Sequence, residues 1–260
     1  MSDEARAEIL TSHIVDLARS GRRIDGRGID DYRPVSVEPG YVTTADGSAL
    51  VRIGDTKAVC GVKLEPGKPF PDTPNAGVLT TNAELVPLSS PMFEPGPPHP
   101  RAIEVSRVVD RAIRAAEMID LTRLCVTPAE KCWTCFVDIH ILDHGGNLID
   151  AAMLAAVGAL SHAVVPAKRF GIAEADYPLE IHHKPVECTF VRLGDTIVTD
   201  PTVDEERACQ GRLTVATDEQ GRVVAMQKGL IGAFSPDDVK DVAERAAKHG
   251  ERLRAIAMEG

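Results

Sequence analysis

The chain has 260 residues, of which 43% are hydrophobic and 26% charged, the composition of a folded globular protein rather than a disordered one. Its formal net charge is −10, so the surface as a whole should repel nucleic acid, and any contact with RNA or DNA needs a local basic patch. Aromatic residues make up only 4%, which argues against an extended base-stacking platform. Six cysteines do not suggest a disulfide framework.

The first part of the chain predicts one helix followed by an antiparallel meander. Residues 3–19 carry an apolar stripe, with Ser2 as the expected N-cap and Gly21 as the stop signal. Strand patterns cover 35–37, 40–44, 48–53 and 57–64, and another strand covers 78–85 between two proline-rich loops. The acidic N-terminus and the lack of an apolar stretch of bilayer length predict a cytoplasmic protein without a membrane span.

The remainder alternates helices and strands. We expect helices over 101–119 and 148–164, a helix from its Ser235 cap to about 257, and strands over 133–142, 186–193, 196–199, 212–217 and 222–227. This order predicts an α+β protein. We expect an N-terminal helix (1–20), a first domain (21–165), a connector (166–185) and a second domain (186–260).

The turn Gly145-Gly146 stands directly before a predicted helix, as in phosphate-binding turns. The residues that follow it include no Lys, Arg, Ser or Thr that would hold a phosphate, and Asp150 would repel one. These residues therefore favour a plain strand-to-helix turn.

A row of arginines marks the predicted helix at 101–119. Arg107, Arg111 and Arg114 are spaced by four and three residues, so they share one helix face. They either form ion pairs with Glu104 and Asp110 or contact the phosphates of a nucleic acid, and the sequence by itself favours neither interpretation.

Three further clusters suggest metal or redox chemistry. The acidic segment 200–206 is either a Mg²⁺ or general-acid site or a solvated loop. Cys132-x-x-Cys135 has the spacing of a redox or zinc pair, but it begins a predicted strand rather than a helix, which favours a structural role. His182-His183 lacks the spacing of a metal-binding pair.

Longer motifs carry a family resemblance. The segments GRRIDGRGIDDYRP, GSALVRIGDTKAVCGVK, PFPDTPNAGVLTTNAELVPLSSPMFEPGPP and HGGNLIDA resemble the ribonuclease PH superfamily, and within it the non-catalytic ring subunit of the archaeal exosome. The resemblance extends from about residue 20 to residue 257. It implies the ribonuclease PH fold, with an N-terminal part like ribosomal protein S5 domain 2 and a smaller C-terminal α/β part.

The same resemblance implies partners and a reaction. In this family the subunit alternates with a catalytic paralogue in a six-membered ring, which S1- or KH-domain cap subunits cover. Single-stranded RNA enters the ring and is degraded from its 3′ end by attack of inorganic phosphate at the catalytic subunit. The resemblance assigns Arg107, Arg111 and Arg114 to RNA binding, and it implies no cofactor and no metal in this chain.

The resemblance also implies that the chain is not itself an enzyme. Catalytic members carry a Gly-Gly-Thr-Arg turn, whereas Asn147 and Leu148 follow the glycines here. Their general acid lies about a dozen residues after the Asp that matches Asp200, a position that Arg212 occupies. An arginine does not donate a proton at neutral pH. The alternatives are a phosphate-dependent 3′→5′ exoribonuclease in its own right and a redox or zinc module.

Overall fold

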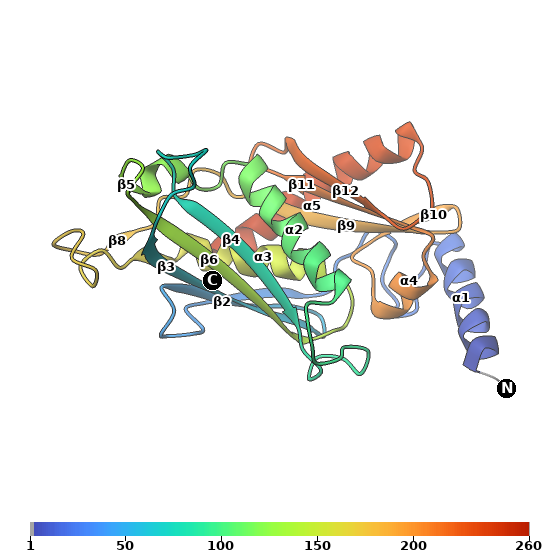
Figure 1. Ribbon diagram of the computed structural model, residues 1–260. Helices are drawn as coiled ribbons and strands as arrows, with labels where there is room; N and C mark the ends of the chain where they lie inside the picture. Colours follow the sequence, from blue (N-terminus) through green and yellow to red (C-terminus); the bar gives the residue numbers. More distant parts are fainter. Residues whose placement is uncertain (1–2, 260) are drawn as a thin grey trace.

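The larger of two main β-sheets is built on the predicted antiparallel meander. The computed structural model describes residues 3–259 (Figure 1). The strands of this sheet are β1 (Val35–Pro39), β2 (Gly47–Ile53), β3 (Thr56–Gly67), β4 (Val78–Leu85), β5 (Cys125–Thr127) and β6 (Lys131–Asp143). They stand in the order β1-β2-β3-β6-β4, with β5 paired to β6. β1, β2 and β3 are antiparallel neighbours, whereas β4 runs parallel to β6.

The second sheet is wholly antiparallel. Its strands are β9 (Val186–Leu193), β10 (Thr196–Thr199), β11 (Gly211–Thr217) and β12 (Val223–Gly229), in the order β10-β9-β11-β12. A small separate pair, β7 (Val164–Val165) with β8 (Tyr177–Pro178), lies in the segment between the two sheets. β12 is an edge strand of the four-stranded sheet, and helix α2 lies beside it (Figure 1).

One buried helix connects the two sheets. The helices are α1 (Asp3–Arg19), α2 (Pro100–Ala115), η1 (Leu121–Leu124), α3 (Leu148–Ser161), α4 (Val203–Ala208) and α5 (Pro236–Glu259). Every residue of α3 from Leu148 to Leu160 is buried, and the helix packs on β2 and β3 of the first sheet and on β9 of the second. A helix that is apolar on all sides belongs in a core. None of the helices within residues 3–259 is long and apolar enough to cross a membrane. The predicted α+β class is confirmed.

Three predicted elements differ from the structure. The helix predicted over 148–164 ends at Ser161, and Val164 belongs to strand β7. Residues 40–44 form a turn, not a strand: Gly40 has a φ of +69°, and the Val42 amide donates to the Ser48 hydroxyl at 2.8 Å, which satisfies the backbone locally. The helix predicted to reach 119 ends at Ala115. Glu117 adopts a left-handed φ of +53°, and the Met118 amide turns back to donate to Ile113 O at 3.0 Å.

The N-terminal helix has the predicted bounds but not the predicted apolar stripe. Ile14 and Ala18 are buried and pack with Val191 of β9, whereas Ile9 and Leu10 are exposed. The predicted cap, Ser2, lies outside the described residues.

Candidate functional site

The three arginines that the family resemblance assigns to RNA binding all lie on α2. The helix begins at Pro100, and the His99 ring accepts a hydrogen bond from the Arg101 amide at 3.2 Å. Its buried face consists of Ala102, Val105, Val108, Val109, Ala112 and Ile113. The opposite face exposes Arg107, Arg111 and Arg114 to solvent.

These arginines differ in what holds them. Arg107 is exposed and has no hydrogen-bond or ion-pair partner among the side chains of residues 8–258. Arg111 Nη1 donates to Oε1 of Gln227 on β12 at 2.7 Å, so a neutral amide fixes its orientation. Arg114 Nε donates to Asp110 Oδ2 at 2.7 Å, one helical turn away. Of the three guanidinium groups, those of Arg107 and Arg111 keep a charge that no carboxylate neutralises by direct contact.

Of the two ion pairs that the sequence allows on α2, Glu104 with Arg107 and Asp110 with Arg114, only one forms. Glu104 does not pair with Arg107 but with Arg212, which reaches it from β11. The predicted pair between Asp110 and Arg114 does form. The ion-paired interpretation therefore applies to Arg114 only.

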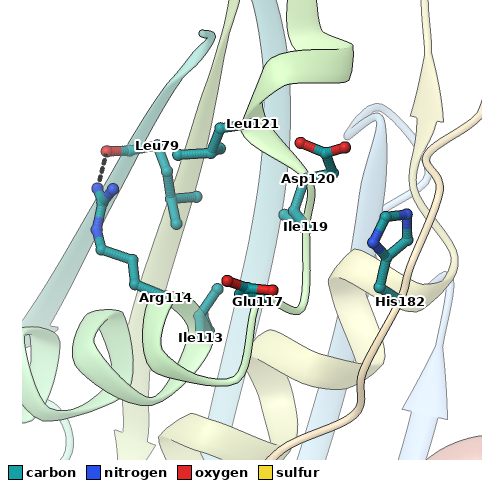
Figure 2. Close-up of a pocket in the computed structure, with 8 residues that line it drawn as sticks. All are labelled: Leu79, Ile113, Arg114, Glu117, Ile119, Asp120, Leu121 and His182. Carbon is teal, nitrogen blue, oxygen red and sulfur yellow. Dashed lines mark hydrogen bonds between the residues drawn. The ribbon is translucent and has the colours of Figure 1, made fainter. Parts of the chain in front are cut away.

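A cavity of about 410 Å³ opens at the C-terminal end of α2 (Figure 2). Arg114 forms one wall and donates from Nη2 to Leu79 O at 2.7 Å. The carboxylates of Glu117 and Asp120 and the ring of His182 line other walls. Two carboxylates in such a small space would repel a phosphodiester, so the exposed face nearer the start of α2 is better suited to RNA.

The Gly-Gly turn binds a carboxylate that another segment of the chain supplies, that of Glu206 on α4. The amide of Asn147, which precedes α3, donates to Glu206 Oε1 at 2.8 Å. The Arg101 guanidinium binds the other oxygen of the same carboxylate. Gly146 has a φ of +99°, and a Cβ there would come within 2.5 Å of the Pro201 carbonyl oxygen. Only glycine lets the segment before α4 approach so closely.

His144 completes the surroundings of this turn. Its Nε2 lies 3.2 Å from Arg101 Nη1, and its ring stacks on Phe93 with centroids 5.4 Å apart. Burial and then the charge of Arg101 lower the pKa of His144 to about 4, so the ring is neutral at pH 7 and accepts from Arg101.

Neither Arg101 nor Glu206 was assigned to this turn from the sequence. The sequence did contain one indication of where Glu206 lies. The spacing Thr202-x-x-Glu205 is that of a capping box, which starts α4 and thereby fixes the position of Glu206 in its first turn.

The acidic segment that starts at Asp200 is not a solvated loop. Asp200 is fully buried and accepts from Arg33 Nη2 at 2.6 Å and Arg27 Nη1 at 2.9 Å. Burial opposes ionisation, but the hydrogen bonds and charge of Arg33 outweigh it and hold the pKa of Asp200 below its ordinary value. Glu205 is equally buried and accepts from Arg23 Nε at 2.7 Å. These carboxylates fasten the arginine-rich loop after α1 to the second sheet.

The cysteine pair lies inside β6. Cys132 and Cys135 are fully buried, and burial raises the pKa of the Cys135 thiol to about 12. A thiol with this pKa does not supply the thiolate that redox exchange needs at neutral pH. Among residues 3–259, no three or more His, Cys, Asp or Glu side chains form a group able to hold a metal ion.

Known proteins match the chain over nearly its whole length. Residues 31–166 match the model for domain 1 of the 3′ exoribonuclease family, and residues 183–249 match domain 2. The exosome complex component Rrp42 of Thermococcus kodakarensis is 46% identical over 258 residues, which cover 96% of this chain and 95% of the relative. The Rrp42 of Thermoplasma acidophilum is 48% identical, with coverage of 97% and 96%.

Solved structures agree with these relatives. A chain of the Archaeoglobus fulgidus exosome with RNA bound to the active site superposes with a TM-score of 0.93 at 43% identity, covering 96% of this chain and 98% of that one. A chain of an archaeal exosome core gives a TM-score of 0.90 at 39% identity, with 99% of each chain covered. The predicted fold and the resemblance to an exosome component are both confirmed, and the chain belongs to the RNase PH, or 3′ exoribonuclease, family.

Proposed function

We propose that the chain is a non-catalytic ring component of an exosome, in which it supports a catalytic RNase PH-like paralogue and holds RNA for 3′→5′ phosphorolytic degradation. The relatives named as exosome component Rrp42 and the matching exosome structures support this role. The ring alternates the two subunits, S1- or KH-domain subunits cap it, and it works in the cytoplasm. Inorganic phosphate binds at the partner subunit, and this chain carries no cofactor.

The observation that carries the non-catalytic role is the carboxylate at the Gly-Gly turn. The Asn147 amide points to Glu206 rather than to open space, so an attacking phosphate would meet a like charge there. Arg212, at the position of the family's general acid, is ion-paired to Glu104 and has no proton to give at neutral pH. A phosphate site and a general acid are two separate requirements of the reaction, and this chain meets neither.

RNA contact is proposed for the exposed face of α2. Arg107 and Arg111 stand one turn apart, and neither charge is neutralised by a carboxylate contact. Guanidinium groups bind phosphate oxygens without reading bases, which suits an enzyme complex that degrades many sequences. Arg114 ranks third, because Asp110 and the backbone of β4 already occupy its donors.

Reconstitution with the catalytic paralogue tests this function. The chain alone should not degrade poly(A) in the presence of phosphate, and the two chains together should form a ring that does. Phosphate-dependent degradation by the purified chain would establish the alternative, an independent exoribonuclease. Failure of the two chains to associate would equally refute the proposal.

The RNA-binding face is tested by charge reversal in the assembled ring. Arg107→Glu with Arg111→Glu should weaken binding of single-stranded RNA and reduce the slope of log affinity against log salt by about 1–2, since each lost phosphate contact contributes roughly 0.7. The matched control is Lys248→Glu with Arg252→Glu, an exposed pair four residues apart on α5. If both double variants weakened RNA binding equally, the effect would come from the change in net charge, and the proposed role of the α2 face would be refuted.

A further inference from the structure

The carboxylate of Glu206 sits where two converging donors would hold an oxyanion. The Asn147 amide at the start of α3 reaches one oxygen at 2.8 Å, and the Arg101 guanidinium binds the other. A backbone N–H at a helix N-terminus and a guanidinium are the donors that proteins use for phosphate and sulfate. The neutral ring of His144 lies 3.2 Å from Arg101 and adds no charge to the site.

Helix α4 is fixed so that this carboxylate cannot easily leave. Thr202 and Glu205 form a reciprocal capping box at its start. Glu205 then points inward to the buried Arg23, while its neighbour Glu206 points to the turn. Gly146 lets the segment before α4 pack against the turn with no room for a Cβ. The position of Glu206 therefore follows from the packing of α4 and not from a flexible surface side chain; its side chain is only 13% exposed.

The space next to Glu206 is cationic. A cavity of about 280 Å³ borders the carboxylate, and its charged lining residues are Arg101, Arg207, Arg212, Glu104 and Glu206. Arg212 is held by Glu104, and Arg101 is held by Glu206. Arg207 pairs with Asp204 at 3.6 Å on the exposed side of α4. Loss of the Glu206 charge would therefore leave the Arg101 guanidinium without a carboxylate partner, next to Arg207 and Arg212, an arrangement that attracts an anion.

We propose that Glu206 is a built-in anion that fills an oxyanion site formed by Asn147 N–H and Arg101, and that this site accepts a phosphate group once the carboxylate is removed. The inference rests on the proposed function in that the turn performs no catalysis in this chain. It adds that the two donors of the site are still present and that the Glu206 side chain occupies it. The ligand chemistry is a phosphate oxyanion, from free phosphate or from an RNA end.

Thermal unfolding of the full chain tests the proposal. Wild type, Glu206→Ala and Glu206→Gln are melted over a series of inorganic phosphate concentrations, with chloride holding ionic strength constant. Phosphate at ten times its Kd should raise the Tm of the Glu206 variants by about 3 °C and leave the wild type unchanged. Glu244→Gln is the matched control, because it makes the same chemical change at an exposed position on α5. It should behave like the wild type.

A second series identifies the donors and the source of the phosphate. Adding Arg101→Met to Glu206→Gln should abolish the phosphate-specific rise in Tm, and a short oligoadenylate is titrated in parallel. Stabilisation of the Glu206 variants by either ligand supports the proposal, and the ligand that acts identifies the source. No phosphate-specific rise in either variant, or an equal rise in the wild type, overturns it. Glu206→Gln keeps the size of the side chain, so the test survives if the alanine variant does not fold. Degradation assays on the chain alone report separately on the proposed function.

Discussion

Asp200→Asn should destabilise the fold strongly, although it changes a single atom. The Asp200 carboxylate is fully buried and accepts from Arg33 Nη2 at 2.6 Å, Arg27 Nη1 at 2.9 Å and Asn147 Nδ2 at 2.8 Å. The substitution keeps the shape and, since asparagine tolerates left-handed backbone, also suits the φ of +49° at this position. Both carboxylate oxygens accept hydrogen bonds, so an asparagine amide removes the negative charge and also turns its NH2 group toward donors. Both effects act in the same, destabilising direction.

The expected loss follows from what remains behind. The Arg33 side chain is only 9% exposed and would be left as a buried charge without a counter-ion. Removing one partner of a buried ion pair costs about 3–5 kcal/mol. Domains of ordinary stability have about 5–15 kcal/mol in all, so this one change would remove a large part of it.

Urea denaturation measures this loss from the shift in midpoint at unchanged slope. Asp16→Asn is the control for the same chemical change, because Asp16 pairs with Arg19 at 3.6 Å with both side chains more than half exposed. That change should stay within about 1 kcal/mol. Combining Asp200→Asn with Arg33→Met should recover part of the loss. If Asp200→Asn costs no more than Asp16→Asn, the buried network does not hold the loop to the second sheet and the reasoning is refuted.

Three further outcomes are expected. Gly146→Ala should lower the free energy of unfolding by more than about 2 kcal/mol, because the left-handed φ is combined with a backbone clash. Gly21→Ala has a left-handed φ in open space and should lower it by about 1–2 kcal/mol. Equal losses for the two variants in urea denaturation would show that the clash contributes nothing. The folded pKa of Asp200 lies below its ordinary 3.8, so the stability it contributes is full above that pH and is lost as the pH falls through the folded value; wild type should lose more stability below pH 4 than Asp200→Asn, and parallel pH curves would contradict this. A thiol reagent should modify the half-exposed Cys125 in the native chain and leave Cys135 unmodified until urea unfolds it; labelling of both at one rate would contradict the burial.

Local patterns predicted most elements of the fold because they report on local physics. The alternating buried residues of β3, the continuous apolar run in β2 and the apolar sequence of α3 each reflect burial of one segment. The strand order has no such local signal. β6 lies between β3 and β4, and its parallel pairing with β4 joins residues more than fifty positions apart.

In the candidate site, too, local spacing was predictable from the sequence and long-range partners were not. Spacing alone put Arg107 and Arg111 on one exposed face of α2. The partner of Glu104 was not predictable, because Arg212 is 108 residues away and reaches it only through the packing of α2 near the second sheet. The acidic segment at 200–206 was misread for the same reason, since its arginine partners precede the first strand.

The net charge of the chain does not argue against the RNA contact proposed for α2. A net charge of −10 counts every arginine alike, but the fold divides them. Arg23 and Arg33 form ion pairs with buried carboxylates, and Arg101 forms one with Glu206 at the Gly-Gly turn. Arg107 and Arg111 have no such carboxylate contact, and they stand together on one face. Because screening limits electrostatic attraction to about 8–10 Å at physiological salt, a phosphate near this face responds to the two guanidinium groups far more than to distant acidic surface. An acidic chain and a local RNA contact are therefore compatible.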